Sequence, residues 1–211
     1  MAKRPAWSIK NDIVISEDFE FEWSGGFALV QKQKNIKALH DSIIQRYGET
    51  ALEVSSKSTI PLGKDIGAFS LKWGDIPLEN IFQSAKKYEK AGPFTDLLQV
   101  SPKEAKQDER HHSSGKLVAF VRDDEVWPLE PKTAFYDYIY LKALTGNYGD
   151  ELDLSEYEWF TDIEFNPKKS INCQARSAAI YKLLQKKKLF GELCEMERWI
   201  AFHRKFVKDG I

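Results

Sequence analysis

The sequence predicts an α+β protein, a single compact and predominantly helical domain with a few short strands. Several segments carry apolar residues at helical spacing, while only short segments alternate between apolar and polar residues. Helices and strands do not alternate strictly along the chain, which argues against a parallel βαβ sheet. The 211 residues contain no internal repeat and no clear linker, so one domain over residues 1–211 is expected.

Four long helices are predicted from apolar residues spaced three and four positions apart. They cover about residues 36–47, 77–88, 132–144 and 173–187. Gly48 ends the first helix, Pro77 begins the second, and Gly92-Pro93 closes it. Ser101 and Glu104 have the spacing of a capping box, which predicts a short helix from that point.

Strands are predicted where apolar and polar residues alternate or where short apolar runs are bounded by turn residues. These segments are residues 19–23, 52–54 and 160–165, and residues 117–121 and 125–127 are expected to form a hairpin around Asp123-Asp124. In the strand over 160–165, Asp162 and Glu164 are expected to share one face.

Composition excludes several classes of protein. With 31 basic and 32 acidic residues the formal net charge is -1, which argues against a non-specific nucleic-acid coat or a polybasic membrane binder. No apolar run is long enough to span a membrane, and no apolar segment of a secretory signal follows Met1. Two cysteines do not make a disulfide framework. We therefore expect a soluble, cytoplasmic protein.

Familiar catalytic motifs are missing from the sequence. It contains no GxGxxG, Walker loop, GxSxG, HExxH or CxxC. The adjacent His111-His112 cannot chelate a metal from one helix face, and no further ligand stands nearby at suitable spacing. We expect neither a metal nor a cofactor.

Glu79 is a candidate for acid/base chemistry. It lies in the first turn of the helix that begins at Pro77, and Gln83 follows at i+4 on the same side. One interpretation is a carboxylate favoured there by the helix dipole. The other is a carboxylate at the edge of a pocket, where partial burial raises its proton affinity.

Asp162 and the polar segment after it form a second candidate. Asn166, Lys168, Ser170 and Asn172 lead into the helix predicted from residue 173. Free N–H groups at a helix start can bind phosphate, and Asn172 alone is equally explained as a helix cap. Asp162 on a solvent-facing edge strand would have the same sequence pattern.

Both an ordinary structural role and a functional role are compatible with the sequence around three further residues, Trp127, Lys132 and Lys57. An aromatic residue near other aromatics usually belongs to the core, but Trp127 close to Lys132 would also suit base stacking beside a phosphate. Lys57 lies in a serine-rich turn, where a lysine is normally solvated. If buried beside a carboxylate, it could donate a proton or attack a sugar carbonyl.

Several of these segments resemble the NADAR family, whose members are associated with NAD and ADP-ribose metabolism. The segment ENIFQSAK at residues 79–86 is similar to the family's helix signature. Further matches follow in the family's order: residues 68–70, Ser101-Pro102 with Ala105, Trp127 with Lys132, Asp162, and the helix start at Asn172.

The sequence resembles one branch of the family even more closely, the NADAR antitoxins that are paired with DarT-type DNA ADP-ribosyltransferase toxins. The likeness lies in residues 31–36, 55–58, 127–137 and 160–179. It covers about residues 4–190, which implies a core over that range and a C-terminal helical extension over 190–211. The family's tryptophan-glycine and glycine-rich turn are replaced here by residues 163–166 and 167–170, so phosphate contacts would use lysine instead.

The resemblance implies hydrolysis of the bond between ADP-ribose and the guanine amino group in single-stranded DNA, with ADP-ribose as product. It implies a catalytic set of Glu79 as acid/base, Asp162 as stabiliser of the ribose cation or orienter of a hydroxyl, and Lys57 as proton donor or imine-forming amine. The implied substrate-binding residues are Ser55, Ser56, Gln83, Trp127, Lys132, Asp137, Asn166, Lys168, Ser170 and Asn172. Two alternatives remain: an N-glycosidase for a small ribosylated metabolite, and a non-catalytic module that binds ADP-ribose or the toxin.

Overall fold

The computed structural model describes residues 1–208, and its elements are distributed along the whole of that range. Their order is β1 (Ala2–Lys10), β2 (Ile13–Phe21), α1 (Leu29–Tyr47), β3 (Ala51–Glu53), α2 (Pro61–Asp65), β4 (Lys72–Trp73), β5 (Ile76–Pro77), α3 (Leu78–Ser84), β6 (Lys86–Tyr88), η1 (Thr95–Gln99), α4 (Pro102–Gln107), α5 (Arg110–Ser113), β7 (Leu117–Arg122), β8 (Glu125–Trp127), α6 (Ala134–Tyr148), β9 (Trp159–Thr161), α7 (Gln174–Lys187), η2 (Phe190–Leu193) and α8 (Met196–Phe206).

The main sheet has four strands in the order β2-β1-β9-β3. β1 is antiparallel to both β2 and β9, whereas β3 and β9 are parallel. Successive side chains of a strand point to opposite faces, and here neighbours such as Trp159 and Phe160 belong to separate apolar clusters. Both faces of the sheet are therefore covered.

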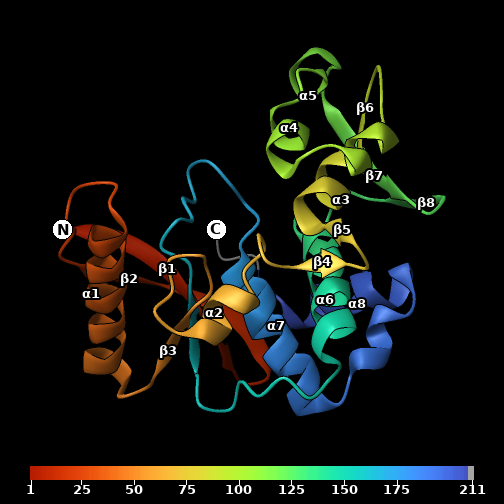
Figure 1. Ribbon diagram of the computed structural model, residues 1–211. Helices are drawn as coiled ribbons and strands as arrows, with labels where there is room; N and C mark the ends of the chain where they lie inside the picture. The colour runs from red at the N-terminus through yellow and green to blue at the C-terminus, as the bar shows by residue number, and fades with distance from the viewer. Residues whose placement is uncertain (209–211) are drawn as a thin grey trace.

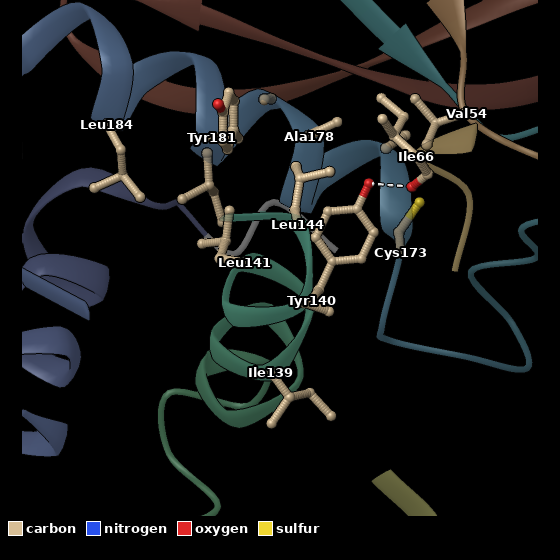
Figure 2. Close-up of a cluster of buried hydrophobic side chains, with 14 of the residues drawn as sticks. Val54, Ile66, Ile139, Tyr140, Leu141, Leu144, Cys173, Ala178, Tyr181 and Leu184 are labelled. Carbon is tan, nitrogen blue, oxygen red and sulfur yellow. Dashed lines mark hydrogen bonds between the residues drawn. The ribbon is translucent and has the colours of Figure 1, made fainter. Parts of the chain in front are cut away.

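One face is covered by α1 and the other by α7, against which α6 packs (Figure 1). On α1, Ile36, Leu39 and Ile43 recur at helical spacing and pack with Phe19 and Trp159 of the sheet. The core on the opposite face joins α6 and α7 (Figure 2), where Tyr140 donates a hydrogen bond from its hydroxyl to the Ile66 carbonyl oxygen over 2.6 Å. This bond satisfies a phenol in an otherwise apolar environment.

A smaller lobe, formed by β6, β7, β8, η1, α4 and α5, projects from the body and is reached through α3 (Figure 1). The predicted capping box of α4 is present, since Ser101 and Glu104 bind each other's backbone N–H groups. The predicted β7–β8 hairpin is also present, with Asp123 and Asp124 at positive φ in its turn. Both local predictions are confirmed.

The α+β class is confirmed, but strands contribute more than a predominantly helical domain would have. The long β1–β2 ribbon was predicted only in part, at residues 19–23. The helix predicted over 77–88 ends at Ser84, because Lys86 and Lys87 pair with β7 as strand β6. The strand predicted over 160–165 ends at Thr161, because the Asp162 side chain accepts a hydrogen bond from the Glu164 N–H and turns the chain.

The segment after residue 190 contains η2 and α8, and α8 is part of the main core. Trp199 and Phe202 of α8 are buried in the same cluster as α6 and α7. Trp199 also donates a hydrogen bond from Nε1 to the Ala134 carbonyl oxygen over 2.8 Å. Within residues 1–208, no helix combines the length and the apolar character that crossing a membrane requires.

Candidate active site

Lys57 and Asp162, two residues predicted from the sequence, are brought together by the parallel pairing of β3 and β9. Glu53 lies opposite Thr161 in this pairing, and the Val54 N–H donates to the Thr161 carbonyl oxygen over 2.8 Å. Because parallel strands end at the same edge of a sheet, the turn that carries Lys57 and the segment that begins with Asp162 leave the sheet side by side.

The opposite wall is formed by α3, which carries Glu79 in its first turn. Gln83 donates a hydrogen bond from Nε2 to Glu79 Oε1 over 2.7 Å, as expected for an i, i+4 pair. Lys106 of α4 places its Nζ 3.9 Å from the same oxygen, and 21% of the Glu79 side chain is exposed. Glu79 is therefore held in place but remains open to a ligand.

Glu79, Asp162 and Lys57 line one cleft of about 650 Å³, which we call the acidic cleft. Three separate parts of the sequence thus supply its candidate catalytic groups. The cleft is completed by Ser56, Ala68, Phe69, Phe82, Gln83, Lys86, Lys106, Tyr136, Glu164, Phe165, Asn166, Lys169, Ser170, Asn172 and Gln174. The arrangement can present a carboxylate, a second carboxyl and an amine to one small polar group.

Asp162 lies at the floor of the acidic cleft and is only 7% exposed. Its Oδ1 accepts from the Glu164 N–H over 3.0 Å, and its Oδ2 accepts from Gln174 Nε2 over 2.9 Å. Burial raises the pKa of the Asp162 carboxyl to about 8, and the nearby charge of Glu53 adds to the rise. At neutral pH this carboxyl holds a proton and can donate a hydrogen bond.

A second hollow of about 650 Å³ adjoins the first, and the two share Phe82, Lys86, Lys169, Ser170 and Asn172. We call it the lysine pocket. Much of its wall is apolar and is formed by Phe82, Leu117, Phe120 and Leu129. Four lysines border it: Lys86, Lys132, Lys168 and Lys169. Within the described part of the chain, none of the four lysines forms an ion pair. Apolar surface with unpaired cations suits a planar, anionic ligand.

Two buried polar atoms that line the acidic cleft have no hydrogen-bond partner among the described residues. They are Gln83 Oε1 and Asn172 Oδ1. Buried acceptors are normally paired, so a ligand donor that reached these side chains would satisfy them. Asn172 is not the helix cap considered from the sequence, because the N-cap position of α7 belongs to Cys173.

The family model described as DarT1-associated NADAR antitoxin matches residues 2–209. The chain belongs to this family. Among curated proteins, none matches the chain. The NADAR resemblance drawn from the sequence is thus confirmed, and it places the chain among the antitoxins of DarT1 systems.

Three residues predicted to bind substrate lie behind the clefts of this NADAR antitoxin. Trp127 is 1% exposed and packs against Phe135 and Tyr138, so it belongs to the core and forms no stacking wall. Ser55 is buried and donates from Oγ to Glu53 Oε1 over 2.6 Å. For Trp127 the more ordinary interpretation, an aromatic core residue, fits the structure.

Asp137 is the third of these residues, and it is fully buried. It binds Arg176, Ser177 and His203, and Arg176 in turn donates from Nη1 to the Ile171 carbonyl oxygen over 3.0 Å. Burial raises the pKa of Asp137, but the Arg176 charge and the His203 contact outweigh it and leave the pKa lowered. Asp137 therefore supports the segment before α7 through Arg176.

Residues that sequence reasoning missed include Gln174, Lys86 and Tyr136, which all line the acidic cleft. Lys86 could have been found, since it is the last residue of the segment ENIFQSAK that resembles the family's helix signature. Gln174 gave no local signal: its Oε1 accepts from the Ala68 N–H over 2.6 Å, a contact between distant segments.

Proposed function

We propose that this NADAR antitoxin is a DNA ADP-ribosyl glycohydrolase. It removes ADP-ribose from the exocyclic amino group of guanine in single-stranded DNA, and so reverses the modification made by the partner toxin. The convergence of Glu79, Asp162 and Lys57 on one cleft carries the proposal. Single-stranded presentation is required because that amino group is engaged when guanine is paired.

Glu79 acts as the acid/base. Breaking the bond between the ribose carbon and the guanine nitrogen develops positive charge on the ribose, and a neighbouring carboxylate stabilises it. Glu79 also takes the proton of the attacking water, which requires a basic group within hydrogen-bond reach of that water. The bond from Gln83 leaves the second oxygen, Oε2, for this step.

Asp162 orients a ribose hydroxyl. Because burial raises the pKa of Asp162 to about 8, it is neutral at pH 7 and does not supply a negative charge to the ribose cation. A protonated carboxyl donates a hydrogen bond to a hydroxyl oxygen and accepts one in return. The structure therefore favours the second of the two roles considered for Asp162.

Lys57 serves the leaving group by one of two balanced routes. In the first, its ammonium gives a proton to the guanine nitrogen as the bond to the ribose carbon breaks, and water adds to that carbon. In the second, its neutral amine attacks the C1′ carbon of the ring-opened ribose, which is still bonded to the guanine nitrogen; that nitrogen takes the proton of the amine and leaves as unmodified guanine, and water later hydrolyses the imine on Lys57. Borohydride reduction traps only the second route as a stable adduct on Lys57.

The ADP part of the substrate occupies the lysine pocket. Its pyrophosphate lies against Lys132 and Lys168, close to Ser170, and its base lies on the apolar wall at Phe82 and Phe120. The acidic cleft then holds the second ribose and the guanine, with Ser56, Gln83, Asn166 and Asn172 as polar contacts.

The deciding experiment incubates the protein with a single-stranded oligonucleotide that carries one ADP-ribosylated guanine. We expect release of free ADP-ribose, and Glu79→Gln should lose turnover by about 10²-fold or more while it still binds ADP-ribose. Glu109→Gln, at an exposed position outside both clefts, is the matched control. No release by the wild-type protein at micromolar concentration would overturn the substrate assignment.

The same assay separates the two alternatives. A small ribosylated nucleotide that is hydrolysed faster than the oligonucleotide would identify a metabolite N-glycosidase. Protection against the toxin that survives Glu79→Gln, together with co-purification of the toxin, would identify a binding module.

A further inference from the structure

Glu53 is a buried carboxyl behind the acidic cleft, with 1% of its surface exposed. Its Oε1 accepts from Ser55 Oγ over 2.6 Å and from the Ile163 N–H over 2.9 Å. Its Oε2 accepts from Thr161 Oγ1 over 2.7 Å. Burial raises the pKa of the Glu53 carboxyl, and the three donors act against that rise, because a carboxylate only accepts hydrogen bonds.

The hydrogen bonds around Glu53 form a network that extends through Thr161 to His40 of α1. Thr161 uses its only hydroxyl hydrogen toward Glu53, so its oxygen must accept from His40 Nε2, which lies 2.8 Å away. Burial lowers the pKa of His40 to about 4, so the ring is neutral at pH 7. The hydrogen of the neutral ring is therefore on Nε2.

This one carboxylate anchors both segments that deliver candidate catalytic groups. Ser55 begins the turn in which its Oγ accepts from the Lys57 N–H over 3.2 Å. Ile163 directly follows Asp162, and Thr161 directly precedes it. A change at Glu53 is thus transmitted to both Lys57 and Asp162.

No cation is paired with Glu53 among the described residues. The titratable groups around the two carboxyls are His40, Glu164, Tyr140 of α6 and Cys173 at the start of α7, and Glu164 is paired with Lys32 over 2.8 Å. Glu53 receives three donors and Asp162 receives two, from Glu164 N and Gln174 Nε2. When the two buried carboxyls share one proton, the proton is better placed on Asp162.

We propose that Glu53 is a positioning residue of the acidic cleft, which fixes the ends of β3 and β9 and, by remaining charged, keeps the shared proton on Asp162. The catalytic meaning of that proton depends on the proposed glycohydrolase activity. The charge on Glu53 and the proton on Asp162 do not depend on that activity.

The first test measures the protonation of the wild-type protein without any substrate. Nitrogen-15 NMR of the imidazole should show His40 neutral with its hydrogen on Nε2. Infrared spectroscopy should show a protonated carboxyl at pH 7 that disappears in Asp162→Asn. A hydrogen on His40 Nδ1, or no such carboxyl band, would overturn the proposal.

The second test replaces Glu53 by glutamine, which keeps the size and the acceptor oxygen and removes the charge. The glutamine amide then donates to Thr161, Thr161 donates to His40, and the His40 hydrogen moves to Nδ1. The midpoint of the Asp162 carboxyl band should fall by about one pH unit or more, since a like charge is removed. An unchanged midpoint in the folded variant would contradict the proposal.

The third test measures the activity as a function of pH, and it separates this inference from the proposed function. The alkaline limb of the pH profile for ADP-ribose release should move to lower pH in Glu53→Gln. Glu49→Gln is the control, because Glu49 accepts from Trp159 Nε1 over 2.7 Å at the other end of β9 and should leave the profile in place. A shifted carboxyl band without turnover in the wild type would reject the glycohydrolase alone, whereas turnover with an unmoved limb would reject the role of Glu53.

Discussion

Asp162 and Glu79 are carboxyl groups of one cleft in different surroundings. Asp162 is nearly buried and its pKa is raised to about 8 by desolvation and by Glu53. Glu79 keeps 21% of its side chain exposed and has Lys106 Nζ 3.9 Å away. Two carboxyls in such different surroundings commonly take different roles in one active site. The difference supports separate roles for the two residues.

The raised pKa of Asp162 predicts how the stability of the fold depends on pH. The unfolded chain loses this proton near the ordinary value of 3.8, while the folded chain keeps it up to about 8. Between these values the folded state binds more protons than the unfolded state, so the free energy of unfolding falls as pH rises. Below about 4, and above about 8, Asp162 adds no further pH dependence.

Asp162→Asn should therefore flatten the fall in melting temperature between about pH 5 and about pH 8. The amide can keep only one of the two hydrogen bonds accepted by Asp162, which costs about 1 kcal/mol at every pH. The comparison therefore uses the slope against pH rather than the melting temperature itself. Equal slopes in the two proteins would refute the raised pKa.

Among single residues, the sequence allowed prediction of those with a local signal. Glu79 and Gln83 were identified by their helical spacing, and Lys57 by its serine-rich turn. Glu53 gave no signal, because its function as an anchor depends on Thr161 and Ile163, more than a hundred positions away. Asp137 was expected to bind substrate, since its buried partners on α7 and α8 are invisible in the sequence.

At the level of elements, short-range chemistry was the part that could be predicted. Gly48 ends α1 in the left-handed region, as its position predicted. β1 was missed because its sequence mixes Pro5 with charged residues and becomes a strand by pairing with β2 and β9. α3 stops early for a similar reason, since pairing with β7 overrides the helical spacing that extends to Tyr88.

Gly63 lies where α2 contacts β3, and we expect that this contact leaves no room for a side chain. A Cβ at this position would overlap the Glu53 carbonyl oxygen and lie 2.6 Å from Ser58 Oγ. Backbone cannot yield as a flexible side chain does, so Gly63→Ala should lower the free energy of unfolding by about 1–3 kcal/mol in urea titrations. Gly146→Ala is the control: it has open space inside α6 and should stabilise by about 0.5–1 kcal/mol. Equal effects at the two positions would contradict the close contact.

For the whole molecule, the buried polar network at Asp137 connects the core to the clefts. It joins α6, α7 and α8 through Arg176 and His203, and Arg176 continues to Ile171 in the segment that lines both clefts. The sequence resemblance ended near residue 190, and it therefore implied that the last helix is an extension. The packing of α8 shows instead that the fold behind the site includes it.

Trp199 is the residue on which this packing can be tested. It is fully buried, stacks on Phe202 with ring centroids 5.2 Å apart, and donates to the Ala134 carbonyl oxygen at the start of α6. Trp199→Ala removes a large buried ring and leaves that carbonyl without this donor, so it should cost about 3–5 kcal/mol of unfolding free energy. Arg204→Ala, exposed on the same helix, should stay within about 0.5 kcal/mol of the wild type. If α8 were an appended helix, Trp199→Ala would leave the main urea transition in place, and the amides of α6 would keep their hydrogen-exchange protection. We expect the transition and the protection to fall together, because α6 and α8 bury one core.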